Sequence, residues 1–420
     1  MPNLYQTLQA RGLLQDATPG AEERLATSPI TAYIGFDPTS DSLHVGNLIP
    51  VMGLAWLQRH KGTPIALVGG GTGMVGDPSG KRSERPVLDI AQIDHNVDGL
   101  RRQLTSFLDF EGPQAARMLN NADWLRNLGL MEFLRDTGKH FTLNYMLQKE
   151  SVRSRMEVGI SFTEFSYMLV QAYDFWHLFR TGQCEMQMGG SDQWGNITAG
   201  IELISRREQR QAHALVFPLL TTSTGDKFGK SEEGNIWLDP DKTSPYKFYQ
   251  FWLNTDDRDV DHYLKLFTFL PLETIEEIVM VHREDPGKRH AQRALAEDLT
   301  ARVHGADVKD RVVEASKALF SGKGSAELSP DLLPEMPECA IPQSEFGPGM
   351  SFIDILCRSG LASSRSDARR GITGKGFYLN GQAVTEPERV VTGDDLQETE
   401  GKRTATLRKG KKNYVKLVIQ

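Results

Sequence analysis

The stretch that decides the fold is Tyr33-Ile34-Gly35-Phe36-Asp37-Pro38-Thr39-Ser40-Asp41-Ser42-Leu43-His44-Val45-Gly46-Asn47. Apolar residues alternate over 30–36 and predict a buried strand, which a polar turn and a helix over 46–60 follow. Backbone N–H groups at a helix start are unpaired and favour negative charge, and His44 and Thr39 add side-chain donors. The junction fits a phosphate site, although a plain strand–turn–helix connection would show the same residues.

Length and composition limit the class of protein. A chain of 420 residues with 39% hydrophobic content predicts two or three domains. Three widely spaced cysteines without a CxxC pair indicate neither a disulfide framework nor a zinc site. No run approaches the roughly 18 apolar residues of a membrane span, and no leader precedes the first strand, so we expect a soluble, cytoplasmic protein without membrane contact.

The charge of the chain is unevenly distributed. The net charge is −7, yet residues 351–420 hold 13 Lys/Arg against 8 Asp/Glu, and the last 20 residues hold seven Lys/Arg and no acid. This asymmetry indicates a basic appendage that meets a polyanion, although a solvated charged tail is a common alternative.

Two further strands end in glycine-rich loops. The strand over 64–68 runs into a loop that contains Asp77 and Lys81, and the strand over 184–188 runs into Gly189-Gly190-Ser191-Asp192-Gln193. The G-x-G-x-x-G at 71–76 is no dinucleotide fingerprint, because Pro78 and polar residues follow where a helix must open. Alternating strands and helices predict an α/β fold with a parallel sheet, which binds ligands at the carboxyl ends of its strands.

The helix predicted over 161–180 carries a polar stripe. Tyr167, Gln171 and Asp174 fall at i, i+4 and i+7 and share one face, whereas the rest of the helix is apolar. A solvated face would carry Lys and Glu, so we favour a pocket that an aromatic hydroxyl, an amide and a carboxylate line.

The remainder divides into a loop, a helical region, a linker and a small basic end. Lys227-Phe228-Gly229-Lys230-Ser231 predicts a cationic loop suited to charge that develops on a pyrophosphate. Helical patterns continue to 320, and five prolines and four glycines over 321–349 predict a linker. Two short helices and strands at 377–379 and 414–419 follow. The basic candidates there are Arg365, Arg369, Arg370, Lys375, Lys409, Lys411 and Lys412.

With His44-Val45-Gly46-Asn47, the Lys227–Ser231 motif and the Tyr167/Gln171/Asp174 stripe, the chain resembles the bacterial tyrosyl-tRNA synthetases. The resemblance implies a Rossmann-like catalytic domain with a helical dimer-interface insertion over 1–223 and a helical domain over 224–320. After the linker it implies an S4-like RNA-binding module over 350–420. It also implies a homodimer with an interface near 120–155, and tyrosine, ATP with Mg2+, and tRNA(Tyr) as ligands, with no dedicated protein metal site.

The resemblance implies a role for each candidate residue. Catalysis and contact with the phosphates fall to Thr39, His44, Lys81, Arg85, Lys227 and Lys230. Tyrosine binding falls to Tyr33, Asp77, Tyr167, Gln171, Asp174 and Gln193. ATP binding falls to Asp37, His44, Gly46, Asn47, Gly190, Asp192, Lys227, Lys230 and Ser231.

Departures and rival functions are few. Asn47 stands where the class I signature has His, and Phe228 and Gly229 stand where its lysine loop has Met and Ser. A tryptophanyl enzyme shares the fold but does not explain Tyr33, Asp174 and the basic end. A nucleotidyltransferase would not explain the helical stripe, and a non-catalytic RNA-binding protein would not need His44 and both lysines.

Overall fold

The computed structural model describes residues 2–77, 79, 89–156, 159–225, 228–231, 234–320, 337–399, 401–410 and 413–420. Contacts between Cα atoms divide the chain into two units. The first comprises Met1–Leu238 and Asp256–Ala291, and the second comprises Asp239–Thr255 and Gln292–Gln420. Within the described ranges, no helix has the length and hydropathy needed to cross a lipid bilayer.

The first unit is built on a six-stranded sheet in the order β1-β6-β5-β2-β3-β4. All neighbours are parallel except β1 and β6, which are antiparallel. The strands are β1 (Asp16–Ala17), β2 (Thr31–Phe36), β3 (Thr63–Val68), β4 (Arg117–Asn120), β5 (Met186–Gly190) and β6 (His213–Phe217). The strand order reverses between β2 and β5, which is where open α/β sheets bind ligands. The predicted α/β class with a parallel sheet is confirmed.

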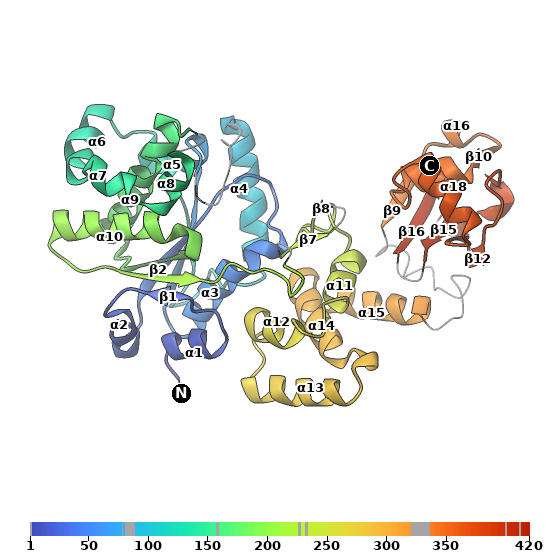
Figure 1. Cartoon of the computed structure of the whole chain (residues 1–420), viewed down its shortest axis with the longest axis horizontal. Coiled ribbons are helices and arrows are strands. Elements are labelled where there is room, and N and C mark those ends of the chain that lie inside the picture. The colour runs from blue at the N-terminus through green and yellow to red at the C-terminus, as the bar shows by residue number, and fades with distance from the viewer. Residues whose placement is uncertain are drawn as a thin grey trace. The chain divides into compact units, whose positions relative to one another are not determined.

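Helices cover both faces of this sheet, as Figure 1 shows. One buried cluster joins Tyr33 and β3 to α9 (Phe162–Gly182) and α10 (Trp194–Glu208). On the other face lies α3 (Leu48–Arg59), where Gly53 leaves room for the ring of Phe217. The side chains of β2 therefore alternate between α9 on one side and α3 on the other.

The other helices of the first unit lie before, between and after the strands. They are α1 (Leu4–Ala10), α2 (Ala21–Thr27), α4 (Ile90–Leu104), α5 (Ala122–Leu125), α6 (Leu130–Asp136), α7 (Leu143–Leu147), α8 (Glu150–Met156), α12 (Val260–Phe267) and α13 (Leu272–Glu284). A short hairpin joins β7 (Lys230–Ser231) to β8 (Gly234–Asn235). The pair α12 and α13 thus belongs to the same unit as the parallel sheet, although the sequence grouped it with the helical region over 224–320.

The second unit contains α11 (Pro245–Leu253), all but the first two residues of α14 (His290–His304), α15 (Ala306–Phe320) and a small α+β module. The module has helices α16 (Gln343–Phe346), α17 (Phe352–Arg358) and α18 (Arg365–Thr373). Its strands are β9 (Glu338–Ile341), β10 (Gly349–Ser351), β11 (Phe377–Leu379), β12 (Gln382–Ala383), β13 (Val390–Thr392), β14 (Gln397–Thr399), β15 (Lys402–Lys409) and β16 (Asn413–Ile419).

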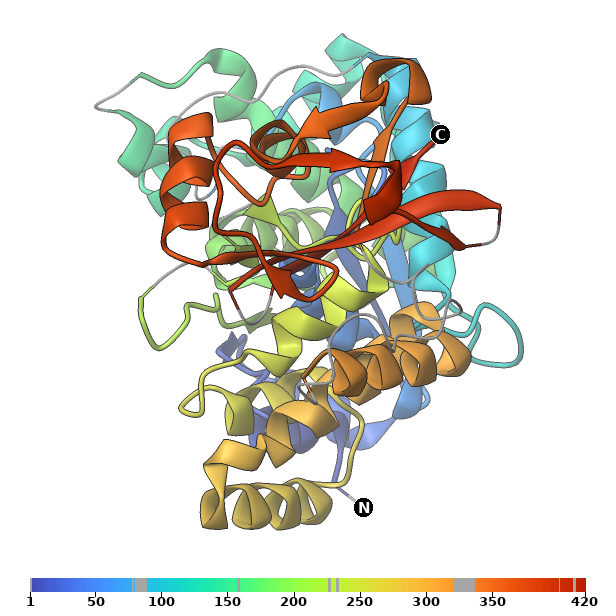
Figure 2. The same ribbon diagram turned by 90° about the vertical axis from the view of Figure 1, so that its right-hand side faces the viewer.

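The sheet of the module runs in the order β12-β11-β15-β16-β9, and Figure 2 shows its long β15–β16 hairpin in dark red. The sequence placed 338–349 in a linker, but β9 pairs in parallel with β16, and Cys339 and Ile341 are buried in the core of the module. The other linker residues, 321–336, lie outside the described residues. The basic end is therefore largely a paired hairpin.

Candidate active site

The His44–Asn47 stretch forms a single 3-10 turn that leads directly into α3. The Gly46 N–H donates to His44 Nδ1 at 3.0 Å, and the His44 N–H donates to Asn47 Oδ1 at 3.0 Å. Because Nδ1 accepts this bond, the proton of the neutral imidazole resides on Nε2. The turn therefore combines an imidazole N–H donor with the start of a helix, as a phosphate site requires.

A distant segment of the chain closes one side of this turn. The Val45 N–H donates to the carbonyl of Ile236 at 2.9 Å, and the Leu238 N–H donates to the carbonyl of Leu43 at 2.9 Å. At Gly229, φ is +87°, and a Cβ there would lie 3.0 Å from the Gly46 nitrogen. Only glycine suits both the conformation and the close approach. The described part of the lysine loop therefore lies directly against the predicted phosphate site.

On β2, Tyr33 and Gly35 face the same side of the sheet. The Tyr33 ring packs 5.4 Å from that of Phe175, and its side chain is buried. Its hydroxyl has no hydrogen-bond partner among the described residues. Burial, followed by the charge of Asp174, raises the pKa of the Tyr33 phenol, which keeps it a neutral donor. Gly35 is exposed, and a Cβ there would meet nothing within 4 Å, so open space adjoins the strand beyond Tyr33.

Asp174 is a buried carboxylate with two side-chain donors. Asn121 Nδ2 donates to Oδ2 at 2.8 Å, and Trp124 Nε1 donates to Oδ1 at 2.7 Å. Burial raises the pKa of Asp174 to about 7, although both hydrogen bonds act in the opposite direction. Asn121 Oδ1 also accepts the Gly71 N–H at 2.7 Å, which fixes the amide orientation. A carboxylate so held can accept one more donor, such as a substrate hydroxyl.

Asp77 forms a second polar cluster at the end of the loop that follows β3. Its Oδ1 accepts the Ser79 N–H at 2.9 Å and Asn196 Nδ2 at 3.4 Å, and its Oδ2 accepts Gln193 Nε2 at 2.6 Å. The three-residue turn Ser191–Gln193 joins β5 to α10 and places Gln193 there. The structure thus brings two predicted residues, Asp77 and Gln193, into direct contact.

The other predicted residues of the first unit lie on the same elements. Tyr167 is buried and Gln171 is half-buried on α9, two turns and one turn before Asp174, respectively. Asp37 follows β2 and is half-buried, whereas Thr39 is exposed. Gly190 ends β5, and Asp192 is exposed on the turn that follows. All of them lie near the carboxyl ends of β2 and β5 or on the helix that covers these strands.

Some predictions fall outside the described residues. These are Lys81, Arg85 and Lys227, and in the basic end Lys411 and Lys412. For Lys230 and Ser231 the structure describes the backbone, which forms β7. In the part of the chain that is described, no three His, Cys, Asp or Glu side chains are grouped so that they could hold a metal ion.

Three of the five described basic candidates of the C-terminal module form ion pairs on or near α18. Arg365 pairs with Asp354, Arg369 lies 4.0 Å from Glu388, and Lys409 lies 3.6 Å from Asp367. Arg370 and Lys375 are exposed on and after the same helix. The structure therefore brings Arg365, Arg369, Arg370, Lys375 and Lys409 to one region of the module.

Sequence reasoning missed three residues of the site, Asn121, Trp124 and Asn196. The first two follow β4, and no motif links them to α9. Their position could have indicated them, because an Asn and a Trp directly after a parallel strand lie at the edge of the sheet where ligands bind. Asn196 follows the glycine-rich turn on α10, where the sequence did point to a site.

Comparisons with known proteins agree with this geometry. Residues 25–321 match the family model of class I tRNA synthetases (W and Y), and residues 331–417 match that of the tyrosine–tRNA ligase SYY-like C-terminal domain. The chain is 59% identical to the tyrosine–tRNA ligase of Anaeromyxobacter dehalogenans strain 2CP-1, over 100% of both chains. It is 51% identical to that of Roseiflexus castenholzii, over 99% of both.

A solved structure gives the same result. The C-terminally truncated mitochondrial tyrosyl-tRNA synthetase of Aspergillus nidulans superposes with a TM-score of 0.70 and 33% identity, over 76% of this chain and 95% of that one. The resemblance predicted from the sequence is confirmed. With family models over most of its length and full-length relatives above 50% identity, the chain belongs to the tyrosine–tRNA ligases, which are class I aminoacyl-tRNA synthetases.

Proposed function

We propose that this chain activates tyrosine with ATP to form tyrosyl-adenylate and pyrophosphate, and then transfers the tyrosyl group to the 3′ end of tRNA(Tyr). The observation that carries the proposal is the buried Tyr33 hydroxyl, which has no hydrogen-bond partner among the described residues. Burial and the charge of Asp174 raise its pKa. The open space at Gly35 adjoins it, and the His44 turn follows the same strand. One ligand with a phenol at one end and phosphates at the other fits this arrangement.

The tyrosine side chain is selected through its hydroxyl. Tyr33 and Asp174 bind the phenol, the first as donor and the second as acceptor. A phenylalanine would leave these buried groups unpaired, and tyrosyl-tRNA synthetase is itself the standard example of this discrimination. Asp77, Tyr167 and Gln171 take the ammonium group, and Gln193, which already donates to Asp77, lies near the carboxylate.

Adenylate formation needs no protein nucleophile, since the tyrosine carboxylate attacks the α-phosphate. The chain contributes positioning and stabilisation of the charge that develops on the phosphates. His44 donates through Nε2, Thr39 adds a hydroxyl, and Gly46 and Asn47 lie against the nucleotide. The ribose falls to Gly190, Asp192 and Asp37.

The departing pyrophosphate requires cations. Lys81, Arg85, Lys227 and Lys230 contact it, and Ser231 completes the loop. ATP enters as its Mg2+ complex, whose ion neutralises phosphate charge. The phosphates themselves provide oxygen ligands for this ion, so the proposal does not require a protein metal site.

We also propose that the enzyme is a homodimer that works in the cytoplasm. Large apolar side chains are exposed close together in the sequence, at Leu130 (70%), Met131 (76%), Leu143 (66%) and Phe162 (79%). Such a concentration is expected of an interface that a second copy covers. The three cysteines are free, which suits a reducing compartment.

Exchange of labelled pyrophosphate into ATP tests the activation step. Tyrosine should support exchange, whereas phenylalanine and tryptophan at equal concentration should support far less. Absence of exchange with tyrosine, or faster exchange with tryptophan, would refute the proposal.

Transfer to tRNA is tested separately. Charge reversal at Arg369 and Arg370 together should leave pyrophosphate exchange unchanged and lower the rate of tRNA charging, because both exposed side chains lie in the C-terminal module. Normal charging by this variant would exclude these two arginines from the tRNA surface.

A further inference from the structure

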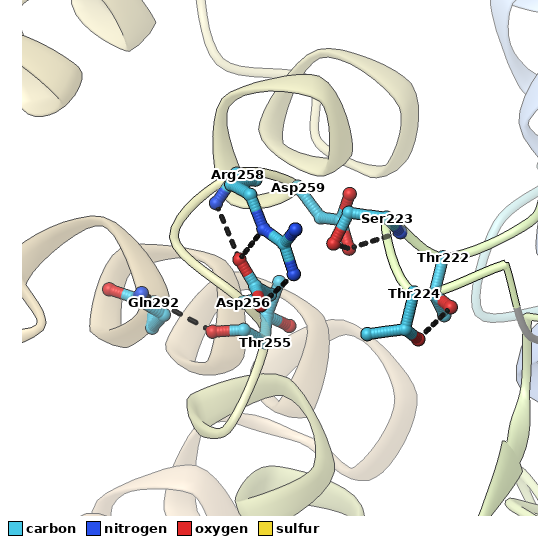
Figure 3. A network of polar contacts seen from close by, with 8 residues as sticks. All are labelled: Thr222, Ser223, Thr224, Thr255, Asp256, Arg258, Asp259 and Gln292. Atoms are coloured by element: carbon cyan, nitrogen blue, oxygen red, sulfur yellow. Dashed lines mark hydrogen bonds and ion pairs between the residues drawn. The ribbon is translucent and has the colours of Figure 1, made fainter.

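The helix α12 contacts the lysine loop on both sides of Lys227 in the sequence. Figure 3 shows the first contact, in which Asp259 faces Ser223. The Ser223 N–H and its hydroxyl both donate to Asp259 Oδ2, at 3.1 and 3.0 Å. Four residues after Ser223, the loop reaches Lys227. One carboxylate oxygen therefore fixes both the backbone and the side chain at the start of the loop.

Asp259 occupies the N-cap position of α12, yet its side chain makes no capping bond to its own helix. An N-cap Asp ordinarily accepts from a backbone N–H in the first turn, which stabilises the helix. The neighbouring Arg258 is bound by Asp256, to which its Nε and Nη2 each donate at 2.9 Å. The carboxylate of Asp259 is thus directed at the loop in place of the usual local partner.

The second contact is apolar and lies on the other side of Lys227. Phe228 is buried and stacks on Phe267 with ring centroids 5.4 Å apart and planes 15° apart. It also meets the edge of Tyr263 at 5.0 Å. Both rings belong to α12. Phe228, which stands where the class I loop has Met, therefore packs against two aromatic rings of α12.

Arg11 links the C-terminal end of α12 to α3. Arg11 donates to the carbonyls of Thr268 at 3.0 Å and Leu270 at 2.6 Å, just beyond the C-terminal end of α12. Its guanidinium also lies 4.1 Å from the ring centroid of Trp56 on α3. Because α3 begins at the His44–Asn47 turn, Arg11 connects the helix that contacts the loop to the helix that follows the predicted phosphate site.

We infer that Asp259 is a positioning residue for tyrosine activation, which acts by fixing Ser223 at the start of the loop whose described residues Phe228 and Gly229 lie beside α12 and the His44–Asn47 turn. This inference rests on the proposed function and adds to it a residue without substrate contact. A loop that is already held in place loses less conformational entropy when the transition state forms, which lowers the activation barrier. The contact should therefore affect the rate of activation and leave tyrosine affinity unchanged, since the proposed tyrosine ligands lie on β2, on α9, on the loop after β3 and on the turn after β5.

The test compares Asp259→Ala, Asp259→Asn and Ser223→Ala in the full-length enzyme. We expect Asp259→Ala to lower the kcat of pyrophosphate exchange by about 5- to 10-fold, the effect of losing two exposed hydrogen bonds to a charged acceptor. Asp259→Asn keeps an acceptor oxygen and should restore most of the rate. Ser223→Ala keeps the N–H donor and the whole of α12, so about a 2- to 3-fold loss is expected. The double variant Asp259→Ala/Ser223→Ala should be no slower than Asp259→Ala alone.

Asp261→Asn is the matched control, because Asp261 lies on the same helix and pairs with Lys265 at 2.9 Å, away from Ser223. It should keep the wild-type rate. An Asp259→Ala enzyme within 2-fold of wild type would overturn the inference, as would an equal loss in Asp261→Asn or additive losses in the double variant. A raised KM for tyrosine in Asp259→Ala would also overturn it. Failure of the wild-type enzyme to exchange with tyrosine would instead refute the proposed function.

Discussion

Replacing Trp124 by phenylalanine should move the pH dependence of tyrosine activation to higher pH. The indole N–H donates to Asp174 Oδ1 at 2.7 Å in a buried site, and this bond holds the pKa of the carboxyl down against the effect of burial. A hydrogen bond to a charged group is worth about 1.5–3 kcal/mol, and each pKa unit corresponds to about 1.4 kcal/mol. The pKa of Asp174, about 7 in the intact chain, should therefore rise by about one to two units.

In the proposed function the ionised carboxylate of Asp174 accepts the substrate phenol, so activity should follow the ionised fraction. At pH 7 the kcat/KM for tyrosine should fall about 5- to 50-fold in Trp124→Phe, and the loss should shrink to about 2-fold or less at pH 9. The profile of kcat/KM reports the pKa of the unliganded enzyme, which is the state described by the structure. Pyrophosphate exchange measured from pH 6 to 9.5 gives this profile.

Trp176 provides the matched control. Its indole N–H donates to Glu208 at 2.7 Å, so Trp176→Phe also removes a bond to a carboxylate, but outside the site. The acid limb of its profile should match that of the wild type. An unshifted acid limb in Trp124→Phe, or a loss that is independent of pH, would show that Trp124 does not tune Asp174.

Three further changes test other parts of the structure. His44→Ala should slow adenylate formation by about 10- to 100-fold with little change in tyrosine affinity, because the proposed contact of His44 with the phosphates is made in the transition state; single-turnover kinetics and equilibrium binding separate the two. Gly35→Val should leave the melting temperature nearly unchanged, since a Cβ there meets nothing, but should raise the KM for ATP or tyrosine by filling the space beside Tyr33. Arg155→Ala should lower the unfolding free energy by about 3–5 kcal/mol, because it leaves the buried Glu164 without the partner that binds it at 2.7 Å; a loss below about 1 kcal/mol in denaturant titration would contradict this.

The sequence predicted the parts of the site that lie on one regular element. The stripe of Tyr167, Gln171 and Asp174 was legible because helical periodicity places i, i+4 and i+7 on one face, and α9 has this geometry. Strand alternation likewise placed Tyr33 and Gly35 together. The two residues that donate to Asp174 could not be predicted in this way. Asn121 and Trp124 follow a different strand and lie about 50 residues before Asp174 in the sequence.

Residues with charged side chains were the harder case in the C-terminal module. The strand β15 reads as a basic tail, because its sequence KRTATLRK carries four cations in eight residues. The strand pairs with β16 and β11, and its Ala405 and Leu407 are buried in the core of the module. Two apolar residues among eight are too few to indicate a buried strand. Lys416 is buried on β16 beside Glu338, 3.0 Å away, and sequence alone cannot show that a lysine faces a partner on the strand β9 about 80 residues earlier.

The pairing of His44 with Trp237 also bears on the order in which the chain is completed during synthesis. The two residues lie about 190 positions apart, and the flanking bonds join residues 43–45 to 236–238. Contacts of such long sequence separation close late in folding. Until residue 238 has left the ribosome, the nascent chain lacks the segment 236–238 that closes one side of the His44 turn. Under the proposed function, the growing polypeptide should therefore reach full affinity for ATP only after more than half of the chain has emerged.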